Sequence, residues 1–428
     1  EYIKTVSQKT YLRTQYNSWY DHMLNITEEN ITGSFYQIEK GLTQNFVKPL
    51  DAYVVDDGWP NVKASFWSFN KKFPNKLTNV TALCNEMGSK FGLWLGPRGG
   101  YTRPDKIAKR YQRAGNGYLN KEARDICVAS TKYIEKLGDF LVETTNEFDI
   151  DYWKLDGFCL KPCLNEKHDH MVGGYEDMYF ATDMWQKWIA LYDKLRAAKP
   201  DIWINMTCYV NVSPWWLQWV NSLWVQNSGD IGFAKNLENQ AQVDKEITYR
   251  DARYFDCLCT RALQIPLKNL YNHEPIYGNT AHVDYTDEEF EKYIYWCTVR
   301  GQALNELHLS VNMMNESKWT SLAAAMNWQK DNYHILQNAQ FIGGNPEENN
   351  IYGYISWDGD DGVIALRNPT DEKTSLTLTL NKLMGAPEDL QGAKRFNVYC
   401  KSLEETDETY AYNSKMDLTM KPFEIMIF

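Results

Sequence analysis

The sequence lacks the features of a membrane-spanning or nucleic-acid-binding protein. No uninterrupted apolar stretch approaches the roughly 18 residues that a membrane span requires. No cluster of basic residues occurs either, in a chain whose formal net charge is −11 at pH 7. Nucleic-acid binding depends on Lys and Arg side chains that neutralise phosphates. We therefore expect no membrane and no nucleic acid as partners, and a ligand that is neutral or cationic.

The sequence also lacks internal repeats, low-complexity segments and an even number of cysteines. Its nine cysteines cannot all pair within the chain. Cys159 and Cys163 are close in sequence, as are Cys257 and Cys259. Neither pair has a second ligand pair at the spacing of a structural zinc site. We therefore expect ordinary thiols and no metal.

A signal-peptide pattern is also missing, and the first residue is Glu1 rather than Met. We therefore expect a processed or trimmed form of a longer chain. A secreted, a periplasmic and a bacterial cytoplasmic location all stay open, as does the oligomeric state.

What is present is the composition of a folded protein with two domains. Hydrophobic residues make up 43% and charged residues 24% of 428 residues, a length greater than one hydrophobic core usually holds. Aromatic residues are abundant, with 16 Trp and 28 Tyr. Flat rings with a polar edge suit the faces of sugars, although aromatic side chains more often serve cores.

The first three quarters of the chain alternate short apolar runs with amphipathic stretches, as βα units around a parallel sheet do. The runs are residues 11–19, 52–55, 91–95, 150–155, 202–206, 223–225, 266–270 and 304–309. Predicted helices include residues 179–198, 287–299 and 318–332. This pattern predicts an α/β fold, a (β/α)8 TIM barrel over residues 1–338, with insertions at about 101–132 and 161–176.

After about residue 339 the pattern changes to short alternating strands separated by turn residues. These strands are residues 351–357, 362–366, 375–380, 394–399 and 422–428. They predict a small C-terminal antiparallel β-sandwich over residues 339–428, which we expect to carry no chemistry.

Carboxylates follow several of the predicted barrel strands. Asp56 and Asp57 follow one run, Lys154 and Asp156 end another, and Asp230 lies in the loop after a third. Barrel enzymes have their active sites at these strand ends. A pair of carboxylates suits glycoside cleavage, because one must be ionised at the anomeric carbon while the other donates a proton to the leaving oxygen.

The surroundings of the two central aspartates predict different roles. The cation of Lys154 favours an ionised Asp156, which fits a nucleophile. Asp230 lies among aromatic residues, including Trp224 and the run 215–219, where desolvation would raise its pKa toward that of a general acid. A simpler explanation also exists, since aspartates at strand ends often cap helices.

Taken together, these motifs resemble the α-galactosidases and α-N-acetylgalactosaminidases of glycoside hydrolase families 27 and 36, grouped as clan D. The most specific are Asp-Asp-Gly-Trp at residues 56–59 and Asp-Tyr-Trp-Lys-Leu-Asp at residues 151–156. The other matching segments are residues 16–20, 53–55, 73–75, 90–94, Cys208 and 224–231.

The resemblance implies a retaining exo-α-glycosidase that removes a terminal α-linked galactose by double displacement, with no metal or organic cofactor. It implies Asp156 as the nucleophile and Asp230 as the acid/base. The long aromatic insertion at residues 214–219 favours a closed pocket for one terminal sugar. By the resemblance, further residues would bind this sugar. These are Asp56, Asp57, Lys154, Trp19, Trp59, Trp94, Cys208 and Tyr209. The three tryptophans could also be core residues.

The sequence departs from the family pattern at three places. Pro97-Arg-Gly-Gly-Tyr101 follows the third predicted strand, where family 36 usually has Pro-Glu-Met. Gly157-Phe158 follows the predicted nucleophile, and Tyr209-Val-Asn-Val-Ser213 follows Cys208, where the families distinguish galactose from N-acetylgalactosamine. The same mechanism on α-N-acetylgalactosamine therefore stays an alternative. Two others are a Schiff-base aldolase that uses Lys154 and a non-catalytic sugar-binding barrel. Glu274 or Asp256 is an alternative acid.

Overall fold

A computed structural model describes residues 2–158, 162–174, 176–208, 213–225 and 227–428. Among these residues, one parallel sheet of nine strands has the order β10-β11-β1-β2-β3-β6-β7-β8-β9. Its strands are β1 (Arg13–Asn17), β2 (Ala52–Val55), β3 (Lys90–Leu95), β6 (Ile150–Phe158), β7 (Trp203–Cys208), β8 (Ser222–Trp224), β9 (Leu270–Tyr271), β10 (Ile276–Tyr277) and β11 (Leu304–Leu309).

The two ends of this sheet meet in one short segment, residues 270–277. Strand β9 pairs with β8, whereas β10 pairs with β11. The segment therefore occupies a single position of the barrel and closes it, which confirms the predicted (β/α)8 barrel. The predicted strand at 266–270 was placed too early. Residues Leu267–Asn269 form a single helical turn instead, with the N–H of Asn269 bonded to the carbonyl oxygen of Pro266 at 2.9 Å.

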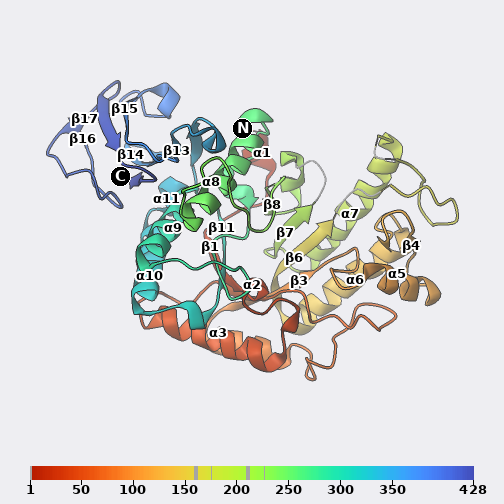
Figure 1. Ribbon diagram of the computed structural model, residues 1–428. Helices are drawn as coiled ribbons and strands as arrows, with labels where there is room; N and C mark the ends of the chain where they lie inside the picture. Colours follow the sequence, from red (N-terminus) through yellow and green to blue (C-terminus); the bar gives the residue numbers. More distant parts are fainter. Residues whose placement is uncertain (1, 159–161, 175, 209–212, 226) are drawn as a thin grey trace.

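Helices surround the barrel (Figure 1). They are α1 (Tyr2–Val6), α2 (Trp19–His22), α3 (Glu28–Thr43), α4 (Thr78–Glu86), α5 (Pro104–Arg113), α6 (Thr131–Phe148), α7 (Met178–Ala198), α8 (Gln242–Phe255), α9 (Asp287–Val299), α10 (Glu316–Asp331) and α11 (Tyr333–Leu336). Several of them begin at a residue whose side chain accepts hydrogen bonds from backbone N–H groups of the first helical turn. Thr286 and Glu289 form a capping box at α9, and Asp177 caps α7.

Two long connections leave the ends of barrel strands at the predicted insertions. The one between β3 and α6 contains α5 and a small hairpin, β4 (Leu119–Asn120) with β5 (Asp125–Ile126). The second lies between β6 and α7. An isolated bridge between Cys163 and Gly173 folds the described part of it back on itself.

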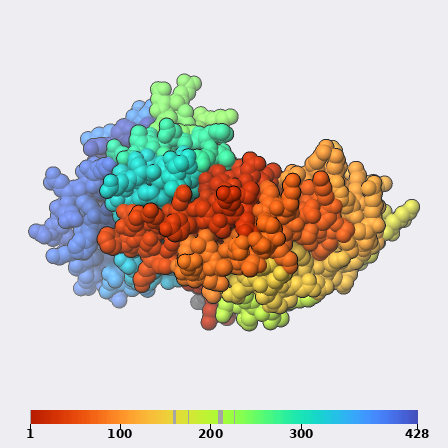
Figure 2. Space-filling view, turned by 90° about the horizontal axis from the view of Figure 1, so that it is seen from below, coloured from red at the N-terminus to blue at the C-terminus, as the bar shows by residue number. Residues whose placement is uncertain are grey.

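The C-terminal part consists of antiparallel sheets, as predicted. One has the order β12-β13-β14-β19, and two others pair β15 with β18 and β16 with β17. The strands are β12 (Gln340–Gly343), β13 (Tyr352–Asp358), β14 (Asp361–Arg367), β15 (Thr374–Thr379), β16 (Ala393–Lys394), β17 (Thr409–Tyr410), β18 (Lys415–Met420) and β19 (Ile425–Ile427). In Figure 2 these residues, in blue, occupy one end of the elongated molecule.

The four-stranded sheet joins the barrel to the outer strands. Tyr352 and Tyr354 belong to the barrel's hydrophobic core, whereas Ile355 and Ile364 pack with Leu418 in a second cluster. Because side chains alternate along a strand, one face of the sheet covers the barrel and the other covers the outer strands. The boundary at residue 339 stays a prediction, since one core extends across it. No helix of the described residues has the length and hydropathy that a membrane crossing needs.

Candidate active site

Charged side chains fill the barrel interior near the carboxyl ends of its strands. Lys154 of β6 lies between Asp56, which follows β2, and Glu306 of β11. Its Nζ is 2.9 Å from Asp56 Oδ2 and 3.5 Å from Glu306 Oε2, and all three side chains are buried. Burial opposes the charge of Lys154, but the two carboxylates outweigh it and raise the Lys154 pKa. Lys154 is therefore a fixed ammonium ion.

Asp156 lies on the same strand, two residues further along, so it points to the same side of the sheet as Lys154. Its Oδ2 accepts hydrogen bonds from Trp94 Nε1 at 3.1 Å and from the Tyr101 hydroxyl at 2.8 Å. Its Oδ1 is buried and has no hydrogen-bond partner among the described residues. One carboxylate oxygen is thus fixed, while the other is left for a ligand.

The pKa of Asp156 reflects two opposing effects. Burial raises the pKa of Asp156, and the cation of Lys154 and the bonds from Tyr101 and Trp94 partly oppose this effect. Lys154 therefore favours the ionised carboxylate, as the sequence predicted. The sequence did not reveal the stronger effect of desolvation.

A cavity of about 350 Å³ opens beside Asp156, within the roughly 300–1,000 Å³ typical of small-molecule pockets. Its lining comes from β3, from the connection after β3 and from the end of β6. The lining residues include Trp94, Arg98, Gly100, Tyr101, Asp156 and Gly157.

Asp57 lies under the connection after β3. Its Oδ1 accepts the N–H of Gly58 at 2.7 Å, and its Oδ2 accepts the N–H of Tyr101 at 3.4 Å. Gly100 allows this approach, since its φ is +68° and a Cβ there would lie 3.3 Å from Asp57 Oδ2. Burial and the charge of Asp56 raise the pKa of Asp57 to about 7.

Asp230 lies in the loop after β8, with its side chain 44% exposed. His273 Nδ1 is 3.4 Å from Asp230 Oδ1, and Arg250 binds the Asp230 carbonyl oxygen at 2.5 Å. Partial burial would raise the pKa of Asp230, but its contact with His273 and the positive charges of Lys154 and Arg250 hold it well below its ordinary value. The predicted rise in the Asp230 pKa was therefore wrong, because these groups from other parts of the chain outweigh the aromatic neighbours that the sequence shows.

The three predicted sugar-binding tryptophans have different positions. Trp19 is half-buried, and its ring centroid lies 6.3 Å from that of Tyr101, at the pocket. Trp94 lines the pocket and holds Asp156. Trp59 has no exposed surface, and it packs against Phe69 and donates to the Trp94 carbonyl oxygen at 2.9 Å. The predicted stacking of Trp59 on a sugar is corrected, because its ring is enclosed in the core.

Two predicted residues cannot be placed. The side chain of Cys208 and all of Tyr209 lie outside the described residues.

Asp56 has both carboxylate oxygens bonded within the protein. Its Oδ2 accepts hydrogen bonds from Asn17 Nδ2 at 2.9 Å and from Lys154, and its Oδ1 accepts the N–H of Asp57 at 2.8 Å.

The alternative acids both have structural partners. Glu274 is fully buried and pairs with Arg250 at 3.0 Å and with Arg300. Asp256 pairs with Arg261 at 3.1 Å at the end of α8. Two guanidinium groups engage both carboxylate oxygens of Glu274, so the geometry favours Asp230 over either alternative.

Three functional candidates were missed by the sequence analysis: Glu306, Tyr101 and His273. Glu306 is buried within a predicted apolar strand, and it also binds Gln15 Nε2 at 2.9 Å and the Tyr271 hydroxyl. A charged residue inside an apolar run was the available signal, because a buried charge needs a partner. Tyr101 and His273 had no comparable signal, since their positions depend on how connections fold over the barrel.

Comparisons with known proteins agree at the level of the fold. No family model matches the sequence, and no curated protein matches it either. Solved structures match closely in shape. An α-galactosidase from Lactobacillus brevis has a TM-score of 0.67 at 12% identity, covering 99% of this chain and 55% of its own.

Structures of two variants of a GH36 α-galactosidase from Geobacillus stearothermophilus match similarly. One, in complex with raffinose, has a TM-score of 0.66 at 14% identity and covers 98% of this chain and 55% of its own. The other, in complex with stachyose, has a TM-score of 0.67 at 14% identity and covers 100% and 56%. The chain spans about half the length of these proteins. Over nearly all of its own length, the chain has the fold of the GH36 α-galactosidases.

Proposed function

We propose that this protein is a retaining exo-α-glycosidase that hydrolyses terminal α-linked galactose. The observation that carries the proposal is the state of Asp156. One of its oxygens is held by two donors, and the other is buried, unpaired and at the wall of a pocket sized for a small molecule. Such a carboxylate is oriented for attack on a bound electrophile.

The chemistry follows from two carboxylates at one face of the barrel. Asp156 Oδ1 attacks the anomeric carbon and displaces the glycosidic oxygen, which takes a proton from Asp230. Asp230 then removes a proton from a water molecule that attacks the same carbon and releases Asp156. Two inversions leave the α configuration unchanged. In this proposal the Lys154 ammonium and Asp57 contact sugar hydroxyls, and Trp19 contacts the ring face.

Galactose as the substrate rests on the shared fold and on the ligands of the neighbours. Raffinose and stachyose are bound in two of the matching structures, and the negative net charge of this chain suits a neutral sugar. N-acetylgalactosamine differs from galactose at C2 only. The segment expected to read C2 is residues 208–213, of which 209–212 lie outside the described residues, so parallel assays must separate the two sugars.

The aldolase alternative conflicts with the state of Lys154. A Schiff base forms from a neutral amine, whereas Asp56 and Glu306 raise the pKa of Lys154 and hold it as a cation. A desolvated lysine without carboxylate partners would be needed instead.

The test is hydrolysis of a chromogenic α-galactoside and its α-N-acetylgalactosaminide counterpart by the wild type, Asp156→Ala and Asp230→Ala. Asp360→Ala, in the exposed turn between β13 and β14, is the matched control. We expect turnover of the galactoside by the wild type and the control. Asp156→Ala should be inactive, and Asp230→Ala should keep activity only on substrates with a good leaving group. Wild-type activity of Asp156→Ala on the chromogenic α-galactoside, or of Asp230→Ala on an α-galactoside with a poor leaving group, would falsify the assignment. A wild type that binds galactose without turnover would indicate a sugar-binding barrel.

A further inference from the structure

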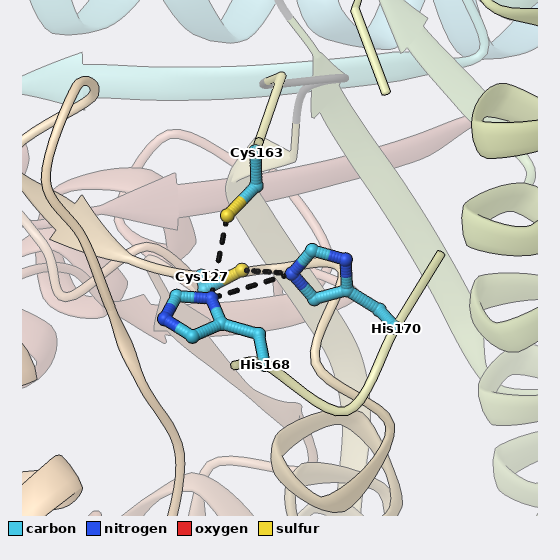
Figure 3. A group of neighbouring side chains, drawn as sticks. All are labelled: Cys127, Cys163, His168 and His170. Atoms are coloured by element: carbon cyan, nitrogen blue, oxygen red, sulfur yellow. Dashed lines mark hydrogen bonds between the residues drawn. The ribbon is translucent and has the colours of Figure 1, made fainter. Parts of the chain in front are cut away.

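A cluster of two cysteines and two histidines lies outside the sugar pocket. The side chains of Cys127, Cys163, His168 and His170 point toward one another (Figure 3), and one ligand atom from each lies within 4.8 Å of all the others. Both sulfur atoms belong to buried residues. We propose that these four residues form a structural site for a divalent thiophilic metal ion, with Zn²⁺ as its occupant.

The distances between the ligand atoms fit a tetrahedron. Cys127 Sγ is 3.2 Å from His170 Nε2, Cys163 Sγ is 3.3 Å from His168 Nδ1, and the two nitrogens are 3.4 Å apart. Zinc bonds of about 2.3 Å to sulfur and about 2.0–2.1 Å to nitrogen place tetrahedral ligands about 3.6 Å apart for N and S and about 3.3 Å apart for two N. The ligands need to move by only a few tenths of an ångström.

The surroundings orient both imidazoles. His170 Nδ1 is 2.8 Å from the carbonyl oxygen of Met171, so Nδ1 carries the proton and Nε2 is left as the ligand atom. The ring of His168 stacks on Tyr118, with centroids 4.3 Å apart and an interplanar angle of 15°. Asn165 Nδ2 lies 3.0 Å from His168 Nε2. Turning that carboxamide would place its oxygen to accept the Nε2 proton, at the loss of its bond to the N–H of Lys167.

The ligands come from the two long connections of the catalytic face. Cys127 follows β5, in the connection after β3, and the other three lie in the connection after β6. Asp169, between the two histidines, also accepts bonds from Thr131 and Lys132 at the start of α6, each at 2.9 Å. A metal ion would therefore fasten the connection after β3, which carries pocket residues, to the connection after β6. With four protein ligands no coordination position stays open, which is the arrangement of a structural zinc site.

The first experiment measures the metal content of the purified, dialysed full chain by elemental mass spectrometry. We expect about one Zn²⁺ per chain. Protein stripped with a chelator should take up Co²⁺ and show thiolate-to-cobalt charge-transfer absorption together with the strong visible bands of tetrahedral Co²⁺. The variants Cys127→Ser and His170→Gln should lose the stoichiometric metal, whereas Cys259→Ser and His334→Gln, both at exposed residues, should keep it.

A stability measurement keeps the proposal testable if a ligand variant folds poorly. Chelation should lower the thermal midpoint of the wild type, and added Zn²⁺ should restore it, because an ion that binds only the folded state stabilises that state. Sub-stoichiometric metal together with cobalt spectra that lack a thiolate band would overturn the proposal. A mass two hydrogens below that of the reduced chain, mapped to a Cys127–Cys163 disulfide, would overturn it as well.

Discussion

The protonation states of Asp156 and Asp230 are set by opposite surroundings. Burial raises the pKa of Asp156, and neighbouring cations lower the pKa of Asp230. The proposed reaction needs Asp156 ionised and Asp230 protonated. In the free protein, a single proton shared by these two carboxylates lies mainly on Asp156, so the reactive form is the minor one. A bell-shaped pH profile has the same shape for either order of ionisation, so the order must be found by moving one pKa at a time.

Tyr101→Phe moves the pKa of Asp156 selectively. The Tyr101 hydroxyl lowers that pKa, so its removal should raise it and reduce kcat/KM by roughly tenfold to a hundredfold, the value of one hydrogen bond to a charged group. With Asp156 as the group of higher pKa, the alkaline limb of the kcat/KM profile should move to higher pH. Movement of the acid limb alone would contradict this order. Tyr36→Phe, exposed on α3, is the control.

Asp57 should make stability depend on pH. Its folded pKa of about 7 lies above the ordinary value of 3.8 for an aspartate, so the folded state binds more protons between these values. Stability due to this group is therefore lost as pH rises from about 4 to about 7. Asp57→Asn removes this loss, and its thermal midpoint should rise relative to the wild type across that range, with each pKa unit worth about 1.4 kcal/mol. A difference in midpoint that is constant with pH would refute the assignment.

At the scale of elements, helix α9 begins with a capping box. Thr286 Oγ1 accepts the N–H of Glu289 at 3.2 Å, and the Glu289 carboxylate accepts the N–H of Thr286 at 2.8 Å. Thr286→Ala should lower the free energy of unfolding by about 1 kcal/mol, because it leaves helix N–H groups without a partner. Thr320→Ala, exposed inside α10, should cost nothing, since alanine favours helix interiors. Equal effects of the two changes in denaturant unfolding would argue against the cap.

Most elements could be predicted from the sequence because their signals are local. Helices α7, α9 and α10 each begin at a capping side chain, and β2, β3 and β11 follow from short apolar runs. Strand β9 was misplaced because residues 266–270 read as an apolar run although Leu267–Asn269 form a helical turn.

The site could be predicted only in part. Strand ends brought Asp56, Asp57, Lys154 and Asp156 to one face, as a barrel requires. Other features depend on residues far apart in sequence, which no local pattern records. His273 next to Asp230 is one example. Another is the Cys127–His170 contact, which joins residues 43 positions apart. From the sequence, Cys127 was expected to be an ordinary thiol.

At the scale of the whole molecule, Asp251 of α8 connects the barrel to the C-terminal sheet. It accepts bonds from the Tyr352 and Tyr354 hydroxyls at 2.6 and 2.7 Å, and from Arg300 Nε at 2.9 Å. All four residues are buried. The β-sandwich is therefore attached through a buried polar network as well as through apolar packing.

Asp251→Asn should strongly destabilise the protein, by about 3–5 kcal/mol, because it leaves buried donors and a cation without their acceptor. Asp256→Asn, which breaks a partly exposed pair with Arg261, should cost no more than about 1 kcal/mol. Denaturant unfolding of both variants makes the comparison, and similar losses would show that Asp251 does not hold the two parts together.

The most direct test of the central claim is covalent labelling of the nucleophile. An α-galactoside with a fluorinated sugar and an activated leaving group forms the glycosyl-enzyme. This covalent intermediate then hydrolyses slowly, because fluorine destabilises the oxocarbenium-like transition state. Mass spectrometry of the intact and digested protein locates the sugar. We predict one galactosyl adduct, on Asp156, and none in Asp156→Ala. An adduct on another residue, or no adduct from an enzyme that turns over ordinary α-galactosides, would contradict the account.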